Sequence, residues 1–374
     1  MRKHCLVMND EFVQIGIIAK YESLEYTLKY CGIGSFTIKL PITEKNIKYM
    51  KNGIWFYLDG KYLGFKESER IDTDNLQIVI SGNLCEVILQ WAVFPKTQNF
   101  YDTIPNICEE MVRNNLISED ERKKEILEII PHEISDTTKV RVQRTGDYIS
   151  DAITDLLSEK EYGFKVNAVM RKERTEGQQA ITALQFQCYY GKDRSVENEQ
   201  GNRPVVFSQR LSNLQGTDYK KDETKERNYF YIAGEDSGTE RKFVEIDSGN
   251  YKQLYRKEEY IDARDLQSTK EDGTSYTDSE YQEILLQRGY EKQKEFDITE
   301  SFTCKVAVDK KGCVFGVDYD LGDYVQIIDD VSEITAKMQI TQVKRVLSET
   351  EILSVTFGYK ELNFIQKLKK KGVL

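Results

Sequence analysis

Short runs of β-branched and aromatic residues, separated by turn-forming residues, fill the first hundred residues of the chain. Such runs are typical of β-strands, because branched and aromatic side chains pack well on a pleated surface, whereas Gly, Pro, Asn and Asp favour turns. The dipeptides Asn52-Gly53 and Asp59-Gly60 fit hairpin turns, because both residue types tolerate positive φ. Several short strands at this spacing indicate a small barrel or sandwich. The expected strands are Phe12–Ala19, Ser23–Lys29, Ser35–Leu40, Ile54–Leu58 and Leu76–Ser81.

A helical pattern replaces the strand pattern near Pro95. Apolar residues recur at helical spacing from Ile104 to Val112 and from Tyr148 to Leu157, and we expect both stripes to face a core. Asp147 and Gly163 would cap the two ends of the second helix. A third helix is predicted where Thr277-Asp-Ser-Glu280 has the form of a capping box, with Tyr281, Ile284 and Leu285 as the apolar face behind it.

Strand-like sequence returns after these helices, so the coarse order is β, mixed, β, mixed, β. The highly charged stretch Asp218–Arg227 is predicted to be a loop. At 374 residues the chain is longer than one ordinary domain, and we expect two to four. The pattern predicts a mainly β protein with α/β insertions. The later expected strands are Phe164–Met170, Ala183–Tyr190, Pro204–Ser208, Tyr229–Ala233 and several within 302–358.

The formal charge of −10 argues against a nucleic-acid-binding protein, which needs clustered Lys and Arg. Either the acidic surface is simply solvated, or it forms a wall past which DNA slides, because like charges repel phosphate. The C-terminal segment is the exception, with Lys367, Lys369, Lys370 and Lys371 beside apolar residues. It fits a solvated helix end or a segment that docks onto an acidic partner.

The seven cysteines are scattered, and only His4 and His132 are available as imidazole ligands. This usage indicates reduced thiols and synthesis in a cytoplasm, and we expect no metal and no cofactor. A secretory signal and an apolar run of the ~18 residues that a membrane helix needs are not evident, so we expect no membrane insertion.

Motifs for common catalytic sites are missing. The chain has no Gly-x-x-x-x-Gly-Lys-Ser/Thr phosphate loop, no His-Glu-x-x-His metal helix and no Gly-x-Ser-x-Gly nucleophile elbow. Carboxylates are the plentiful candidates, because a glycosidase needs two of them about 5–10 Å apart. The adjacent pairs Glu109-Glu110, Glu258-Glu259 and Asp329-Asp330 leave a hydrolase open as an alternative, although we expect no enzyme.

Asp318, Asp320 and Asp323 are spaced closely enough to raise the possibility of a calcium site. An EF-hand loop would place a ligand at 322 and a glycine at 323, but the chain has Gly322 and Asp323. The spacing favours a turn at the start of a strand, with the Asp side chains bonded to their own backbone.

Three stretches combine turn formers and charged residues with strand-like neighbours, as expected where a sheet changes direction. They are Gly191-Lys-Asp-Arg-Ser195, Tyr260–Leu266 and Tyr319–Val325. In this order they resemble the tail proteins of long-tailed bacteriophages, the siphophage tail-protein family. Other matching segments are Ile15-Gly16-Ile17, Tyr21–Leu24, Tyr30, Gly34–Phe36, Leu40-Pro41, Val205–Ser208, Tyr231–Gly234 and Val355–Gly358.

Proteins of this family look like relatives of the baseplate hub of contractile tails. The resemblance implies two tail-tube-like β-barrel domains plus mixed α+β decorating domains. The implied division is 1–95 as the first barrel, 96–189 as a mixed domain, 190–235 with 300–358 as the second barrel, 236–299 as a helix-containing insertion packed with the mixed domain, and 359–374 as a basic C-terminal helix or tail.

The resemblance also implies a structural role in the virion. A homotrimer would close the distal end of the sixfold tail tube, below the tube or distal tail protein and above a spike, fibre or tape-measure protein. DNA would pass through the lumen without specific binding. The protein would be made in the bacterial cytoplasm and placed at the tail tip or baseplate of the virion. A peptidoglycan hydrolase using paired carboxylates and a sixfold distal tail adaptor are the alternatives.

Within this picture, Asp193 with Arg194 and Asp262 with Arg264 would be structural or interface ion pairs. Arg suits that role because its planar guanidinium binds a carboxylate through two bonds. Ser195 and the turn Leu321, Gly322 and Asp323 complete the residues expected to act in structure or assembly.

Overall fold

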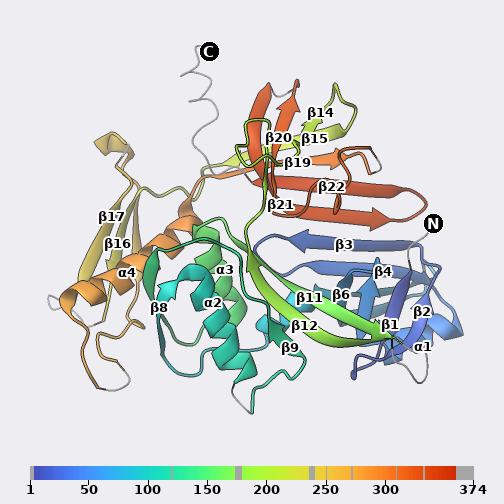
Figure 1. Cartoon of the computed structure of the whole chain (residues 1–374), viewed down its shortest axis with the longest axis horizontal. Helices are drawn as coiled ribbons and strands as arrows, with labels where there is room; N and C mark the ends of the chain where they lie inside the picture. The colour runs from blue at the N-terminus through green and yellow to red at the C-terminus, as the bar shows by residue number, and fades with distance from the viewer. Residues whose placement is uncertain are drawn as a thin grey trace.

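The chain is mainly β, as the sequence predicted, and its elements lie in three regions (Figure 1). Both ends of the described chain build a large sheet, helices and two small sheets lie in the middle, and a third small sheet with a long helix lies at the far side. The computed structural model describes residues 4–118, 121–172, 179–235, 241–249, 251–270, 273–308, 310–331 and 333–358.

The N-terminal half of the large sheet is antiparallel and follows from alternating burial. In β4 the buried side chains Phe36, Ile38 and Leu40 are two residues apart, as the pleat requires. The strand order is β2-β1-β5-β6-β7-β4-β3. The strands are β1 (Cys5–Met8), β2 (Gln14–Ile18), β3 (Ser23–Lys29), β4 (Ser35–Pro41), β5 (Trp55–Leu58), β6 (Tyr62–Asp72) and β7 (Gln77–Leu84).

All five strands predicted in this half are present, but β1, β6 and the helix α1 (Glu44–Asn52) were missed. The hairpin at Asp59-Gly60 is confirmed, because both residues have positive φ and join β5 to β6. The hairpin at Asn52-Gly53 is wrong. Gly53 instead ends α1 with φ of −75° and donates its N–H to the carbonyl of Tyr49.

The C-terminal half of the large sheet contains the strands predicted at Pro204–Ser208 and over 302–358, and two strands, β13 and β15, that were not predicted. The stretch expected to be a loop, Asp218–Arg227, begins as strand β15, which pairs with β19. The strands are β13 (Asp193–Arg194), β14 (Val206–Ser208), β15 (Leu214–Asp222), β19 (Thr299–Val306), β20 (Tyr324–Asp329), β21 (Ile334–Leu347) and β22 (Glu351–Gly358).

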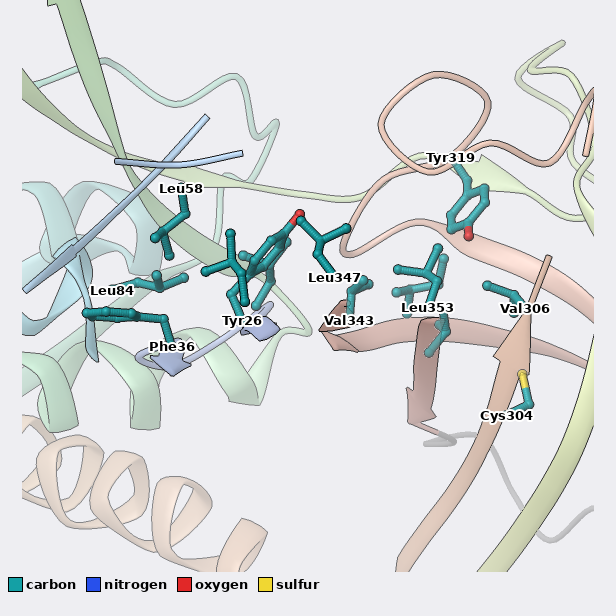
Figure 2. Close-up of a cluster of buried hydrophobic side chains, with 14 of the residues drawn as sticks. Tyr26, Phe36, Leu58, Leu84, Cys304, Val306, Tyr319, Val343, Leu347 and Leu353 are labelled. Carbon is teal, nitrogen blue, oxygen red and sulfur yellow. The ribbon is translucent and has the colours of Figure 1, made fainter. Parts of the chain in front are cut away.

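The two halves form one sheet because β21 pairs with β3, from Gln342 opposite Lys29 to Leu347 opposite Leu24. One hydrophobic core follows the same path. Figure 2 shows Val343 and Leu347 between Tyr26 of the N-terminal half and Leu353 of the C-terminal half. Across this join, Arg345 donates to Asp59 at 2.9 Å, and Asp59 also accepts from the Tyr26 hydroxyl at 2.6 Å.

The described strands of the large sheet do not close into a barrel. Its longest path runs from β15 at one end to β2 at the other, and these two strands are not paired with each other. The strands establish the mainly β class, whereas the arrangement in two barrels stays a prediction.

The middle region packs two helices against short sheets around a second core. Both predicted helices are present, and their apolar stripes are buried as expected. The predicted cap at Asp147 is wrong, because Tyr148 is the N-cap of α3 and makes no side-chain cap bond. The elements are 3₁₀ helix η1 (Cys85–Leu89), β8 (Gln98–Thr103), α2 (Ile104–Val112), π-helix η2 (Arg113–Ile117), β9 (Leu127–Ile129), β10 (Lys139–Arg144), α3 (Ile149–Glu159), β11 (Gly163–Lys172) and β12 (Gln179–Tyr189).

The third region is a small sheet covered on one face by α4, with a third core between them. The capping box of Thr277 and Glu280 is confirmed at the start of this helix. The strand expected at Tyr229–Ala233 is present, but it pairs with β17 and β18 rather than with the large sheet. The elements are β16 (Tyr229–Ala233), β17 (Phe243–Asp247), η4 (Gln253–Tyr255), β18 (Glu258–Asp262), α4 (Asp278–Gln293) and η5 (Lys294–Phe296).

Candidate assembly site

Two of the three turn-rich stretches meet in the structure, and the third lies elsewhere. Asp193 and Arg194 of β13 pair in parallel with Tyr324 and Val325 at the start of β20. The stretches 191–195 and 319–325 therefore form one joint at the edge of the large sheet, which we call the Asp323 joint. The stretch Tyr260–Leu266 instead continues β18 of the small sheet.

Asp323 is the centre of this joint and is 4% exposed. Its Oδ1 accepts the backbone N–H of Lys192 at 2.7 Å, and its Oδ2 accepts Nε of Arg194 at 2.7 Å. Oδ2 also accepts the backbone N–H of Asp320 at 3.0 Å. One buried carboxylate thus binds both stretches, through charge-assisted bonds that are stronger than neutral ones.

The predicted pair of Asp193 with Arg194 does not form. Neighbouring residues of a strand point to opposite faces, so Arg194 turns to Asp323 while Asp193 meets Lys337 at 2.6 Å. Asp193 also accepts the N–H of buried Ser195 at 2.9 Å. Burial raises the pKa of Asp193, but Lys337 and Ser195 outweigh it, so the pKa lies below its ordinary value.

Glycines allow the two stretches to approach closely. A Cβ on Gly191 would lie 1.8 Å from the carbonyl oxygen of Gly322. Gly322 itself has φ of +92°, and a Cβ there would lie 2.3 Å from the Tyr30 ring. The Tyr30 hydroxyl accepts the N–H of Gly191 at 3.2 Å, so the end of β3 is tied to the same joint. Leu321, beside Gly322, packs against the first core.

The three aspartates tested as calcium ligands bind backbone N–H groups, as the turn interpretation predicted. Asp318 accepts from Val314 at 2.9 Å, and Asp320 accepts from Leu321 at 2.9 Å. Within the described residues, no group of three or more His, Cys, Asp or Glu side chains is placed to hold a metal ion.

The second predicted pair does form, on the exposed side of the small sheet. Arg264 donates to Asp262 through Nε at 3.0 Å and through Nη2 at 2.6 Å, and Arg241 adds a third bond at 2.7 Å. These bonds lower the pKa of Asp262 to about 2, and the bonds from Arg264 have the largest effect. The Arg264 side chain is 66% exposed, so water surrounds most of this network.

An aromatic surface beside this pair was missed in the sequence. The residues of β16 to β18 that face away from α4 include Tyr231, Phe243 and Tyr260, and the last two are 47% and 50% exposed. The guanidinium of Arg256 lies 3.6 Å from the centre of the Tyr229 ring. Strand alternation could have revealed this face, because it places Tyr229 and Tyr231 together on one side of the strand and Phe230 and Ile232 on the other.

A buried ion pair between the middle region and the small-sheet region was also missed. Arg144 of β10 pairs with Glu291 of α4, and both side chains are almost fully buried. Gln287, one turn before Glu291, donates to Glu159 of α3 at 2.7 Å. These contacts join polar residues that are distant in sequence, so no local sequence pattern predicts them.

The carboxylate pairs considered for hydrolysis are engaged with other groups. Arg256 pairs with Glu258, Arg227 with Glu259, and Arg210 with Asp330. Glu109 accepts the backbone N–H of His132 at 2.8 Å. Among the described residues, no helix is both long and apolar enough to cross a membrane.

A comparison with known protein families identifies the family to which this chain is similar. The family model described as Siphovirus ReqiPepy6 Gp37-like protein matches residues 5–359. No curated protein sequence matches the chain.

Several solved phage tail proteins have a similar fold at low sequence identity. A tail protein from Neisseria meningitidis MC58 is 12% identical with a TM-score of 0.57, over 96% of this chain and 97% of that one. A prophage MuSo2 43 kDa tail protein from Shewanella oneidensis is 10% identical with a TM-score of 0.53, over 95% and 98%. The prophage tail protein gp18 from Listeria monocytogenes EGD-e is 14% identical with a TM-score of 0.51, over 99% and 98%.

Proposed function

Because the chain belongs to the family of Siphovirus ReqiPepy6 Gp37-like proteins, we propose that it is the hub of a phage tail tip. Its fold is that of phage tail proteins from several bacteria, which supports a structural place in the virion. In the proposed role, a homotrimer closes the distal end of the tail tube and connects it to a spike, fibre or tape-measure protein.

The observation that carries this proposal is the joining of two β-sheet halves in one chain. β3 and β21 unite a half built from residues 5–84 with a half built mainly from 193–222 and 299–358. Three such chains would present six similar sheet units to a sixfold tube and a threefold face to the tip below. Assembly would also cover the exposed ends of the sheet at β2 and β15, which are otherwise free to pair wrongly.

The proposed domain division keeps the predicted boundaries with one change. Residues 1–95 and the segments 190–235 with 300–358 are the two tube-like units, except that β16 belongs with the 236–299 insertion. The Asp323 joint, with Arg194, Ser195, Leu321 and Gly322, holds the two segments of the second unit together. Asp262 and Arg264 lie on the exposed face available to a neighbouring subunit.

The charge of −10 suits a conduit through which DNA passes without binding. Synthesis in the bacterial cytoplasm and incorporation at the tail tip complete the proposed role.

Subunit counting tests the proposal. We expect light scattering to give a trimer, or class averages of tail tips to show threefold density assigned to this chain by antibody labelling. Six copies in a ring would favour the distal adaptor instead. Clearing of host cell wall in a zymogram, lost on substitution of one carboxylate, would establish the hydrolase.

A further inference from the structure

The region formed by β16, β17, η4, β18, α4 and η5 has a core of its own, and we call this region the α4 module. Phe230 of β16 and Tyr281 and Leu285 of α4 are fully buried in that core. α4 lies tightly on its sheet, because a Cβ on Gly289 would lie 2.7 Å from the Ile246 side chain. Among the described residues, this apolar cluster shares no member with the cluster of the middle region. The hydrophobic effect therefore holds the module together, and other forces hold it to the middle region.

Polar contacts join the α4 module to the middle region. Arg141 of β10 pairs with Glu280 at 2.9 Å and with Glu283 at 3.0 Å, both on α4. Gln143, also on β10, donates to the carbonyl of Gln267 at 3.3 Å and accepts the N–H of the same residue at 2.6 Å. Polar interfaces between two regions of one chain permit relative motion, unlike large apolar ones.

The pair of Arg144 and Glu291 is the most buried ion pair of this interface. The two side chains are 3% and 1% exposed, so water reaches neither of them while the module is docked. Nε of Arg144 has no hydrogen-bond partner within the described residues, although Asp147 lies 3.8 Å from it. The desolvation of such a pair offsets most of its attraction, whereas loss of one partner leaves a buried charge uncompensated. Docking is therefore sensitive to this pair.

Two chain connections attach the module to the large sheet, and they lie side by side. One runs from the end of β15 at Asp222 to β16, and the other runs from η5 to the start of β19 at Thr299. The backbone N–H of Arg227 in the first connection donates to the carbonyl of Phe296, where the second begins, at 3.2 Å. Connections that meet at one place can act as a hinge, because a few residues there absorb the change in backbone angles.

We propose that the α4 module rotates away from the middle region as a rigid body about these two connections, and that the pair of Arg144 and Glu291 is the latch that holds it docked. Undocking uncovers the arginines of β10 and the carboxylates of α4, two surfaces of opposite charge. Either surface can then bind a neighbouring subunit of the tail tip, a consequence that rests on the proposed function, whereas the rotation itself is a property of the single chain.

Pulsed electron paramagnetic resonance on the full chain tests the rotation by measuring the distance between two nitroxide labels. Asp151→Cys on α3 and Lys252→Cys before η4 place one label at an exposed position on each region. Six of the seven native cysteines are buried, and a chain without the new cysteines measures labelling of the seventh. Relative to the wild type, Glu291→Gln should increase the fraction of molecules at a second, longer distance about tenfold, because the Arg144 charge stays buried without its partner.

Matched variants separate rotation from unfolding. Arg144→Met with Glu291→Leu should keep the docked distance, because apolar side chains of similar volume can replace a buried ion pair without loss of stability. Asp330→Asn, which breaks the exposed pair with Arg210, should leave the distance unchanged. In Glu291→Gln, the amides of β16, the central strand of the small sheet, should stay protected from hydrogen exchange.

A single docked distance in Glu291→Gln would overturn the proposal. A second distance that comes with loss of protection in β16 would overturn it as well, because the module would then unfold rather than rotate. Opening of the apolar double variant would show that the ion pair is not the latch, and it would have the same consequence.

Discussion

The Asp323 joint and the Asp262 network contain the same chemistry in opposite surroundings. Each has an aspartate bound by arginine, next to turn residues that interrupt strand-like sequence. Asp323 is 4% exposed and joins segments 129 residues apart, whereas Asp262 lies 43% exposed and binds an arginine two residues away. The same residue pattern therefore forms a structural anchor where it is buried and a surface network where it is not.

Replacing the central carboxylate of each site should give the largest difference. Asp323→Asn leaves the guanidinium of Arg194 without its partner in a partly buried position, and we expect a loss of roughly 3 kcal/mol in the free energy of unfolding. Asp262→Asn should cost less than about 1 kcal/mol, because exposed ion pairs contribute little. Urea denaturation measures both, and equal losses would contradict the comparison.

Glycine substitution should give the next largest effect and separates backbone strain from close contact. Gly322→Ala meets the Tyr30 ring at positive φ, and we expect a loss of roughly 2–4 kcal/mol. Gly316→Ala is the matched control, because Gly316 has φ of +79° but no atom within 4 Å of the added Cβ.

The control should lose only about 1 kcal/mol, which is the cost of the strained φ. A loss at position 316 as large as that at 322 would show that the approach of Tyr30 contributes nothing.

Salt and pH should give the smallest effects and should act on the exposed network alone. The pKa of Asp262 is lowered to about 2, below the ordinary 3.8, so its contribution is present above pH 4 and is lost as the pH falls towards 2. We expect the difference between the wild type and Asp262→Asn to shrink in that pH window. It should also shrink in 1 M salt, where screening extends over ~3 Å.

Denaturation of Asp323→Asn in the same buffers provides the contrast. Its deficit should persist in high salt, because a buried pair is screened much less than an exposed one. A deficit that disappears with salt would place Asp323 among the surface pairs.

Local sequence patterns predicted which segments form strands and helices better than they predicted which strands pair with each other. The alternation in Ser23–Lys29 and Ser35–Leu40 was enough for β3 and β4, and the spacing of Ile104, Ile107 and Met111 was enough for α2. β15 was missed because most of its residues are polar and exposed, so its pairing with β19 makes it a strand. The pairing of β3 with β21 had no local signal at all.

The same limit applies to the candidate site. The sequence identified both stretches of the Asp323 joint, but it paired Arg194 with its neighbour Asp193, because only the fold brings Asp323 to that position. The Asp262 and Arg264 pair was predicted correctly because both members lie in one turn. The buried pair of Arg144 and Glu291 could not be predicted from the sequence, because its members are 147 residues apart.

The pairing of β3 with β21 also sets an order for biosynthesis. Tyr26 and Arg345 are 319 residues apart, so at ~5–20 residues per second a ribosome needs roughly 15–60 s to complete the strand that covers β3. During that interval the open edge of β3 can pair with a neighbouring nascent chain. Yield in a heterologous host should therefore depend on chaperone supply and growth temperature more than the final stability would suggest.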